Sequence, residues 1–155
     1  MKRELNPATA GRESAPGKWM LSVCLALWAV MASAADSLEI DHAWIREAPP
    51  GAPMMAGYLC LENNADAPVT LVGVESPQFE FIMMHRTETV KGMARMLHQD
   101  KVVIAAGKRV CFEPGGLHLM MPAPEPRLVA GDRVELDLLF EDESRRRITV
   151  PVKAP

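Results

Sequence analysis

The chain has 155 residues, with 17 Lys and Arg against 20 Asp and Glu, and a formal net charge of −3 at pH 7. This length is enough for one domain with a hydrophobic core of its own. The acidic balance excludes the broad basic surface by which proteins commonly bind nucleic acid.

The first segment has the order of a secretion signal. It carries four basic residues, Lys2, Arg3, Arg12 and Lys18. The apolar run WMLSVCLALWAVMA (19–32) and the small residues ASA (32–34) follow, as in a signal peptide that is cleaved after Ala34. This run is shorter than the roughly 20 residues that span a bilayer. We predict a signal peptide over residues 1–34 and one exported domain over residues 35–155.

Removing the leader makes the domain more acidic. Four of the 17 basic and two of the 20 acidic residues leave with it, so 13 basic and 18 acidic residues remain and the net charge becomes −5. The local basic run ESRRRI (143–148) stands beside the acidic EDE (141–143), which favours a solvated strand or turn.

The rest of the chain consists of short alternating runs that are separated by turn residues. LEIDHAWIRE (38–47) ends at APPGAP, and MAGYLCLEN (55–63) places Leu59 and Leu61 on one face, opposite to Cys60. Similar runs follow at 69–76, 80–90, 94–105, 108–114, 118–123, 133–142 and 146–154. About eight short strands at this spacing predict an all-β fold, an antiparallel sandwich or Greek-key barrel.

Two cysteines remain after Cys24 leaves with the leader, Cys60 and Cys111. They could pair in an oxidising compartment. Free cysteines are often small core residues, however, and we favour that interpretation over a disulfide. No CxxC occurs, so a thioredoxin-type redox motif is not expected.

The stretch PGGLHLMMP (114–122) combines core residues with possible metal ligands. Because side chains alternate along a strand, Leu117, Leu119 and Met121 share one face, and His118 and Met120 share the other. The leucine face suits the core. We therefore predict that the His–Met face is the outer or rim side of its strand.

Two further donors lie upstream, His85 after the apolar run FEFIMM and Met96 in GMARMLH. With His118 and Met120 they offer two imidazoles and two thioethers. Thioether sulfur suits Cu(I) and binds Zn(II), Mg(II) and Ca(II) poorly, and imidazole accepts copper as well. These uncharged donors predict a site for Cu(I).

The spacing His85–x10–Met96–x21–His118–x–Met120 resembles the signature of the periplasmic copper chaperones called PCu(A)C. The segments HAWIREAPPGAPMMAGYLCLEN, PGGLHLMM and LVAGDRVELDLLFED are also similar to that family, and the resemblance covers residues 38–152. It implies a cupredoxin-like Greek-key β-sandwich or barrel whose exposed rim holds one Cu(I) through the four residues. It also implies a periplasmic protein that delivers copper to the copper centre of cytochrome c oxidase or to its assembly factors.

The chain departs from the family pattern at two places. Arg86 follows the first histidine where some members have Met, and Met84, which precedes it, is expected to face the core. The His/Met-rich tail of some members is missing after PVKAP, so a second, Cu(II)-binding site is not expected. Of the remaining histidines, His98 lies two residues from Met96 and could pack behind the ligands, but we expect it to be solvent-exposed. We expect His42 to be structural, beside Trp44 by alternation.

Two alternatives stay open on the residues alone. A blue-copper electron-transfer protein could use His85, Cys111, His118 and Met120, although FEPGG separates Cys111 from His118 and Met96 then has no role. A secreted β domain without metal could instead use its Met-rich rim to bind another protein. No nucleophile–base arrangement or glycine-rich phosphate loop is readable, so an enzyme is not expected.

Overall fold

The computed structural model describes residues 37–155, which contain ten strands and no helix. The strands are β1 (Leu38–Arg46), β2 (Met54–Asn63), β3 (Val69–Glu75), β4 (Met83–Val90), β5 (Met93–His98), β6 (Val102–Ile104), β7 (Lys108–Phe112), β8 (Leu117–Pro122), β9 (Arg133–Phe140) and β10 (Arg145–Lys153). The predicted signal peptide lies outside the described residues. No helix among these residues is long and apolar enough to cross a membrane.

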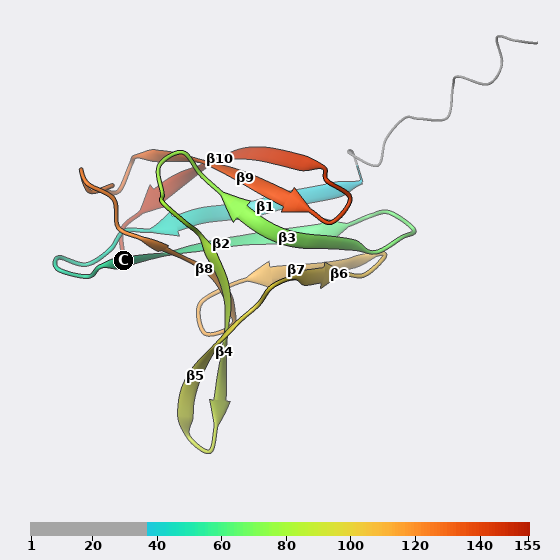
Figure 1. The fold of residues 1–155 in the computed structure, drawn as a ribbon, viewed down its shortest axis with the longest axis horizontal. Helices are drawn as coiled ribbons and strands as arrows, with labels where there is room; N and C mark the ends of the chain where they lie inside the picture. The colour runs from blue at the N-terminus through green and yellow to red at the C-terminus, as the bar shows by residue number, and fades with distance from the viewer. Residues whose placement is uncertain (1–36) are drawn as a thin grey trace, which may run out of the picture. The chain divides into compact units, whose positions relative to one another are not determined.

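The strands form one hydrogen-bonded sheet in the order β5-β4-β8-β7-β2-β1-β10-β9-β3-β6, with a further pairing of β8 with β2. The β1–β10 and β7–β8 pairs are parallel, and the others are antiparallel. The sheet curls into a half-barrel (Figure 1). The predicted all-β class is confirmed.

One predicted strand is divided in two. The run 94–105 was expected to be a single strand, but it forms β5 and β6, which lie at opposite ends of the strand order. β5 pairs with β4 and β6 pairs with β3. The break between them carries the chain from one edge of the sheet to the other, which alternation within the run does not reveal.

The concave face of the sheet holds the hydrophobic core. Leu59 and Leu61 of β2 are fully buried, as their alternation predicted, and Leu119 and Met121 of β8 lie in the same cluster. Met84 is also buried there, so its predicted core position is confirmed. Gly57 allows β8 to approach β2 closely, because a Cβ at this position would lie 3.2 Å from Met121 Cε.

Cys60 and Cys111 form a disulfide between β2 and β7. The prediction of two separate core cysteines is therefore wrong. The two residues are direct partners in the antiparallel register, with their Cα atoms 4.1 Å apart, and both are only half-buried. The disulfide depends on the pairing of two strands that are far apart in the sequence. The sequence of either strand alone does not predict this pairing.

The basic run 143–148 leads into β10, in agreement with the predicted solvated strand or turn. Arg147 donates hydrogen bonds of 2.8 Å to both carboxylate oxygens of Asp137 on the neighbouring strand β9. These bonds hold the pKa of the Asp137 carboxyl below its usual range. The positive charge of this run thus pairs with acidic residues of the same sheet.

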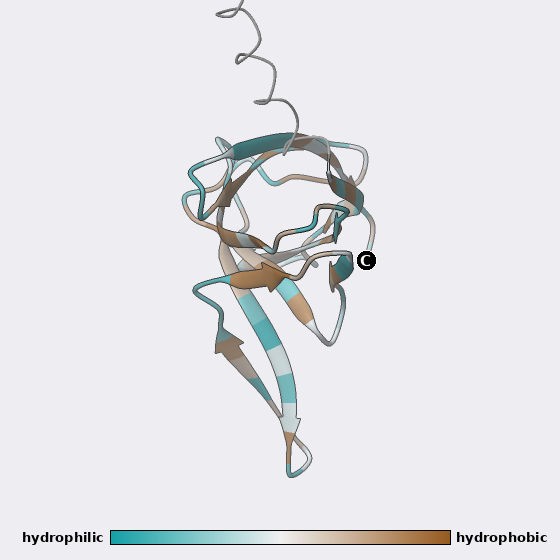
Figure 2. Cartoon of the chain, turned by 90° about the vertical axis from the view of Figure 1, so that its right-hand side faces the viewer, coloured by the Kyte–Doolittle hydropathy of each residue, from teal (hydrophilic) through white to brown (hydrophobic). Residues whose placement is uncertain are grey.

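The β4–β5 hairpin extends away from the curled sheet (Figures 1 and 2). Lys91 and Gly92 connect its strands and both have positive φ, 52° and 79°. Positive φ at both central residues is the mark of a type I′ turn, which matches the twist of paired strands. At the base of the hairpin the Gln99 N–H donates a 2.9 Å hydrogen bond to the Met84 carbonyl. All six residues of β5 are exposed.

Candidate metal centre

Three histidines form a row across the strands β5, β4 and β8. His85 of β4 is the direct partner of His98 on β5 and of His118 on β8. Directly opposed residues of antiparallel strands project from the same face of the sheet. The ring centroids of His85 and His98 are 5.6 Å apart, and those of His85 and His118 are 5.9 Å apart.

The two predicted methionine ligands lie diagonally to His85 on the same face. Met120 of β8 is opposite Met83, two residues before His85, and Met96 of β5 is opposite Thr87, two residues after it. Such diagonal neighbours are roughly 7–8 Å apart, within reach of long side chains. The register thus brings His85, Met96, His118 and Met120 onto one face of three adjacent strands.

Exposure changes strongly across this face. His118 is only 6% exposed, His85 and Met120 are half-buried, and Met96 is 58% exposed. The four ligands were expected to lie at an exposed rim. This prediction is wrong for the His118 side chain, which is buried, and correct for the Met96 side chain. The reason is that β8 lies inside the sheet, with β4 and β2 on either side of its His118–Met120 half, whereas β5 is an edge strand.

The Gly116 carbonyl fixes the orientation of His118. It lies 3.1 Å from His118 Nδ1 and also accepts a 3.0 Å hydrogen bond from the Thr87 N–H. A carbonyl oxygen can only accept, so Nδ1 carries the proton and Nε2 presents its lone pair. Histidines that bind metals commonly have such a bond at the nitrogen that does not bind the ion.

The described residues offer His85 Nδ1 no hydrogen-bond partner, although this atom is buried. An unbonded buried polar atom is costly, and a metal ion bound at this nitrogen would remove the cost. Burial, followed by the neighbouring His118 and His98, lowers the pKa of the His85 imidazole. His85 is therefore neutral at neutral pH, which is the form that binds a metal.

A family model described as "Putative lipoprotein LpqE-like" matches residues 38–152. The chain belongs to the LpqE-like family. It is 30% identical over 120 residues to "Putative lipoprotein Lxx21020" of Leifsonia xyli subsp. xyli, covering 77% of this chain and 71% of that protein.

Solved structures connect this LpqE-like chain to PCuAC domains. The copper-bound PCuAC domain from PmoF2 is 27% identical, with a TM-score of 0.64 over 77% of this chain and 94% of that domain. CuI-DR1885 from Deinococcus radiodurans is 28% identical, with a TM-score of 0.61 over 77% of this chain and 81% of that protein. The predicted membership of the PCuAC-related family and the predicted cupredoxin-like fold are confirmed.

Sequence reasoning missed Met83 on the donor face of this LpqE-like chain, and it did not predict which residue His98 pairs with. Met83 lies opposite Met120 and shares the face of His85, which alternation along β4 already indicated. His98 is solvent-exposed, as expected, but it is also the direct partner of His85. That pairing depends on the register of the hairpin, which the two-residue turn sets.

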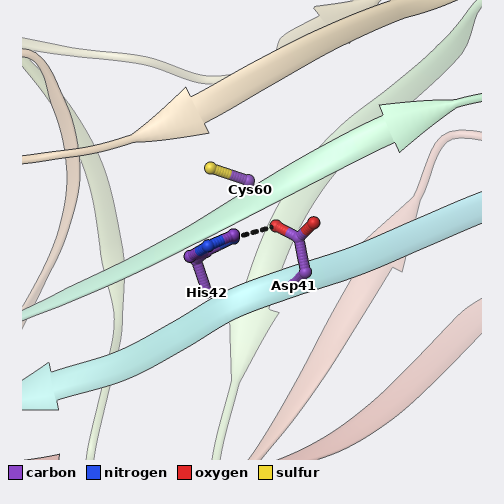
Figure 3. A group of neighbouring side chains, drawn as sticks. All are labelled: Asp41, His42 and Cys60. Atoms are coloured by element: carbon purple, nitrogen blue, oxygen red, sulfur yellow. Dashed lines mark hydrogen bonds and ion pairs between the residues drawn. The ribbon is translucent and has the colours of Figure 1, made fainter.

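A second cluster of possible metal ligands lies on β1 and β2, and its side chains already form a disulfide and ion pairs. Among the described residues, Asp41, His42 and Cys60 have ligand atoms within 4.8 Å of one another (Figure 3). The Cys60 sulfur belongs to the disulfide, and Asp41 pairs with Arg109 and with His42. This cluster is therefore not a metal site.

His42 itself departs from the predicted alternation with Trp44. Its φ is 50°, and the register of β1 against β2 shifts between Asp41 and Trp44. A bulge of this kind turns the His42 side chain out of the regular pattern, where it is exposed.

The disulfide excludes the blue-copper alternative. That site needs the thiolate of Cys111 beside His85, His118 and Met120. The Cys111 sulfur is bonded to Cys60 and has no thiolate to give.

Proposed function

We propose that the chain is a copper chaperone that carries one Cu(I) on His85, Met96, His118 and Met120. The observation that carries the proposal is the direct pairing of His85 with His118, where one imidazole has a buried, unbonded nitrogen and the other a fixed tautomer. Two imidazoles prepared in this way, with a thioether diagonal to His85 on either side, suit a soft metal ion.

The chemistry of the donors favours Cu(I) over harder ions. Imidazole and thioether both bind without a formal charge, and the face around His85 offers no carboxylate from β4, β5 or β8 among its direct partners. Ions that prefer oxygen, such as Mg(II) and Ca(II), gain little from this set. Two of the similar structures, the copper-bound PCuAC domain from PmoF2 and CuI-DR1885, contain copper, which supports the same metal.

The difference in exposure gives a route for transfer. His118 and Met120 belong to a strand inside the sheet, whereas Met96 belongs to the exposed edge strand. A neutral thioether is a weak ligand, so a donor from a recipient protein can replace Met96 while the two imidazoles still hold the ion. The copper then passes from the exposed side of the site without becoming free.

We propose that the protein is located in the periplasm. The proposed recipient of its copper is the copper centre of cytochrome c oxidase or one of its assembly factors. The predicted signal peptide supports export. The Cys60–Cys111 disulfide supports an oxidising compartment, because such bonds persist in exported proteins and are rare in the cytosol. The recipient follows from the resemblance to the PCu(A)C chaperones.

The ligand assignment is tested by replacing two methionines of the same strand. Met96 and Met93 are both 58% exposed on β5, but alternation puts them on opposite faces. We expect Met96→Ala to weaken Cu(I) binding about tenfold or more, which is about 1.4 kcal/mol, and Met93→Ala to bind as the parent does. Competition with a chromophoric Cu(I) chelator under a reductant measures both. Equal affinities of the two variants would contradict the assignment.

Delivery needs a separate measurement. Cu(I)-loaded protein is mixed with the apo copper-binding domain of cytochrome c oxidase subunit II, and the metal content of both is measured after separation. We expect the recipient to gain copper faster than a chelator of equal affinity does. A chain that takes up no stoichiometric Cu(I) at all would instead favour the secreted interaction domain without metal.

A further inference from the structure

His98 occupies a position that the four-ligand site does not use. It follows Met96 by two residues on β5, so both side chains project from the same face. It is also the direct partner of His85, and the row His98–His85–His118 therefore spans β5, β4 and β8. Three imidazoles on three neighbouring strands are more nitrogen donors than a two-histidine Cu(I) site requires.

The spacing of the rings suits a shared ion. Two imidazoles bound to one metal, with metal–nitrogen bonds of about 2.0 Å, have ring centroids roughly 4.5–6 Å apart. The His85–His98 and His85–His118 centroids are 5.6 and 5.9 Å apart, and the ring planes meet at 77° and 79°. Both pairs thus have the separation of ligands to one ion, with His85 in the middle.

His98 also has a partner for its second nitrogen. Its Nε2 lies 3.4 Å from the Asp100 carboxylate, which leaves Nδ1 for an ion. A carboxylate at the second nitrogen is a common partner of histidines that bind metals. The ligand atoms of the three histidines do not all lie within 4.8 Å of one another in the structure. The exposed His98 side chain must therefore rotate toward His85, and its exposure leaves it free to do so.

We propose that His98 is an additional copper ligand, and that His85, His98 and His118 together hold Cu(II) on the same face that holds Cu(I). The inference rests on the proposed copper-carrying function and extends it to the oxidised ion. Cu(II) prefers nitrogen donors, whereas thioether sulfur suits Cu(I). β5 therefore offers Met96 to the reduced ion and His98 to the oxidised ion.

Cu(II) is the divalent ion that this set selects. Among first-row divalent metals, affinity for nitrogen sites generally peaks at Cu(II) and is lower for Zn(II). The three imidazoles are uncharged when they bind, so the selection rests on ligand type and on the geometry of the strands.

The test compares two exposed histidines of the purified protein. His98→Ala removes the proposed ligand, and His42→Ala removes an exposed histidine of β1 outside the donor face. Cu(II) is added at constant pH without a reductant, affinity is measured by competition, and electron paramagnetic resonance counts the bound nitrogens. We expect His98→Ala to lose one nitrogen and to weaken Cu(II) binding at least about tenfold, with Cu(I) affinity within about twofold of the parent.

The outcomes separate this inference from the proposed function. If His98→Ala and His42→Ala keep the same nitrogen count and the same Cu(II) affinity, the inference is overturned while Cu(I) carriage stands. If the parent protein takes up no stoichiometric Cu(I), the proposed function fails, whatever the Cu(II) result. Displacement of bound Cu(II) by an equal concentration of Zn(II) would also overturn the inference.

Discussion

The strands β8 and β5 both contribute donors to one face, yet they are held very differently. β8 lies inside the sheet, its His118–Met120 half between β4 and β2, and three of its residues, Leu117, Leu119 and Met121, belong to the core. Among the strands of residues 37–155, β5 is an edge strand that pairs only with β4, and none of its six residues is buried. The candidate site therefore has one fixed side and one side that can move.

This difference follows from which side chains each strand can bury. Burial of apolar surface contributes about 25 cal/mol per Å², and β8 gains it along one whole face. β5 carries apolar residues too, but the side chains of Met93, Met96 and Leu97 are exposed to solvent. Segments with few buried contacts open at low free energy, so β5 is the part of the site that moves most easily. A carrier that must release its ion gains from this arrangement, because the fixed side keeps its geometry while the other side opens.

Removal of the disulfide should have the largest effect on stability, because it destabilises the strands that hold β8 in the sheet. It joins β2 to β7, and both strands pair with β8. The two cysteines are 51 residues apart, and closing a loop of this size stabilises a protein by about 4 kcal/mol in the chain-entropy account. We expect the double variant Cys60→Ser, Cys111→Ser to lose roughly 2–5 kcal/mol in urea unfolding. The reduced parent should lose a similar amount, and a loss below about 1 kcal/mol in both would show that the fixed side does not depend on this bond.

A pair of leucine substitutions measures the contrast directly. Leu119 of β8 is fully buried, whereas Leu97 of β5 is 42% exposed. We expect Leu119→Ala to reduce the free energy of unfolding by about 2–5 kcal/mol, because it leaves a cavity in the core. Leu97→Ala should cost less than about 0.5 kcal/mol. Urea unfolding of both variants checks this, and equal losses would mean that the hairpin is held as firmly as the sheet.

The sequence predicted which side chains share a face but not which strands lie side by side. Alternation correctly gave the core positions of Leu59, Leu119 and Met121 and the shared face of His118 with Met120, because it is a property of one strand. The Cys60–Cys111 bond, the His85–His98 pairing and the burial of His118 all depend on pairing between strands. Register is set by turns and by the core as a whole, so a single strand does not encode it.

The smallest predicted effect comes from the turn of the hairpin. Lys91 has φ of 52°, a conformation in which Asn is much more favourable than Lys, and Asn followed by Gly92 is a preferred type I′ sequence. We expect Lys91→Asn to stabilise the hairpin by roughly 0.5 kcal/mol or less. Amide hydrogen exchange in β5 should slow, and Cu(I) affinity should rise slightly because the movable side is better organised before binding.

Glu143 offers a matched control for this change. It also has positive φ, 65°, but it lies in the turn between β9 and β10, far from β5 in the strand order. Glu143→Asn should stabilise its own turn by a similar amount and leave both the exchange of β5 amides and the copper affinity unchanged. If the two Asn variants change copper affinity equally, the order of the β4–β5 hairpin does not limit binding. If only Lys91→Asn raises the copper affinity, the mobility of β5 lowers the affinity of the site and favours release of the ion.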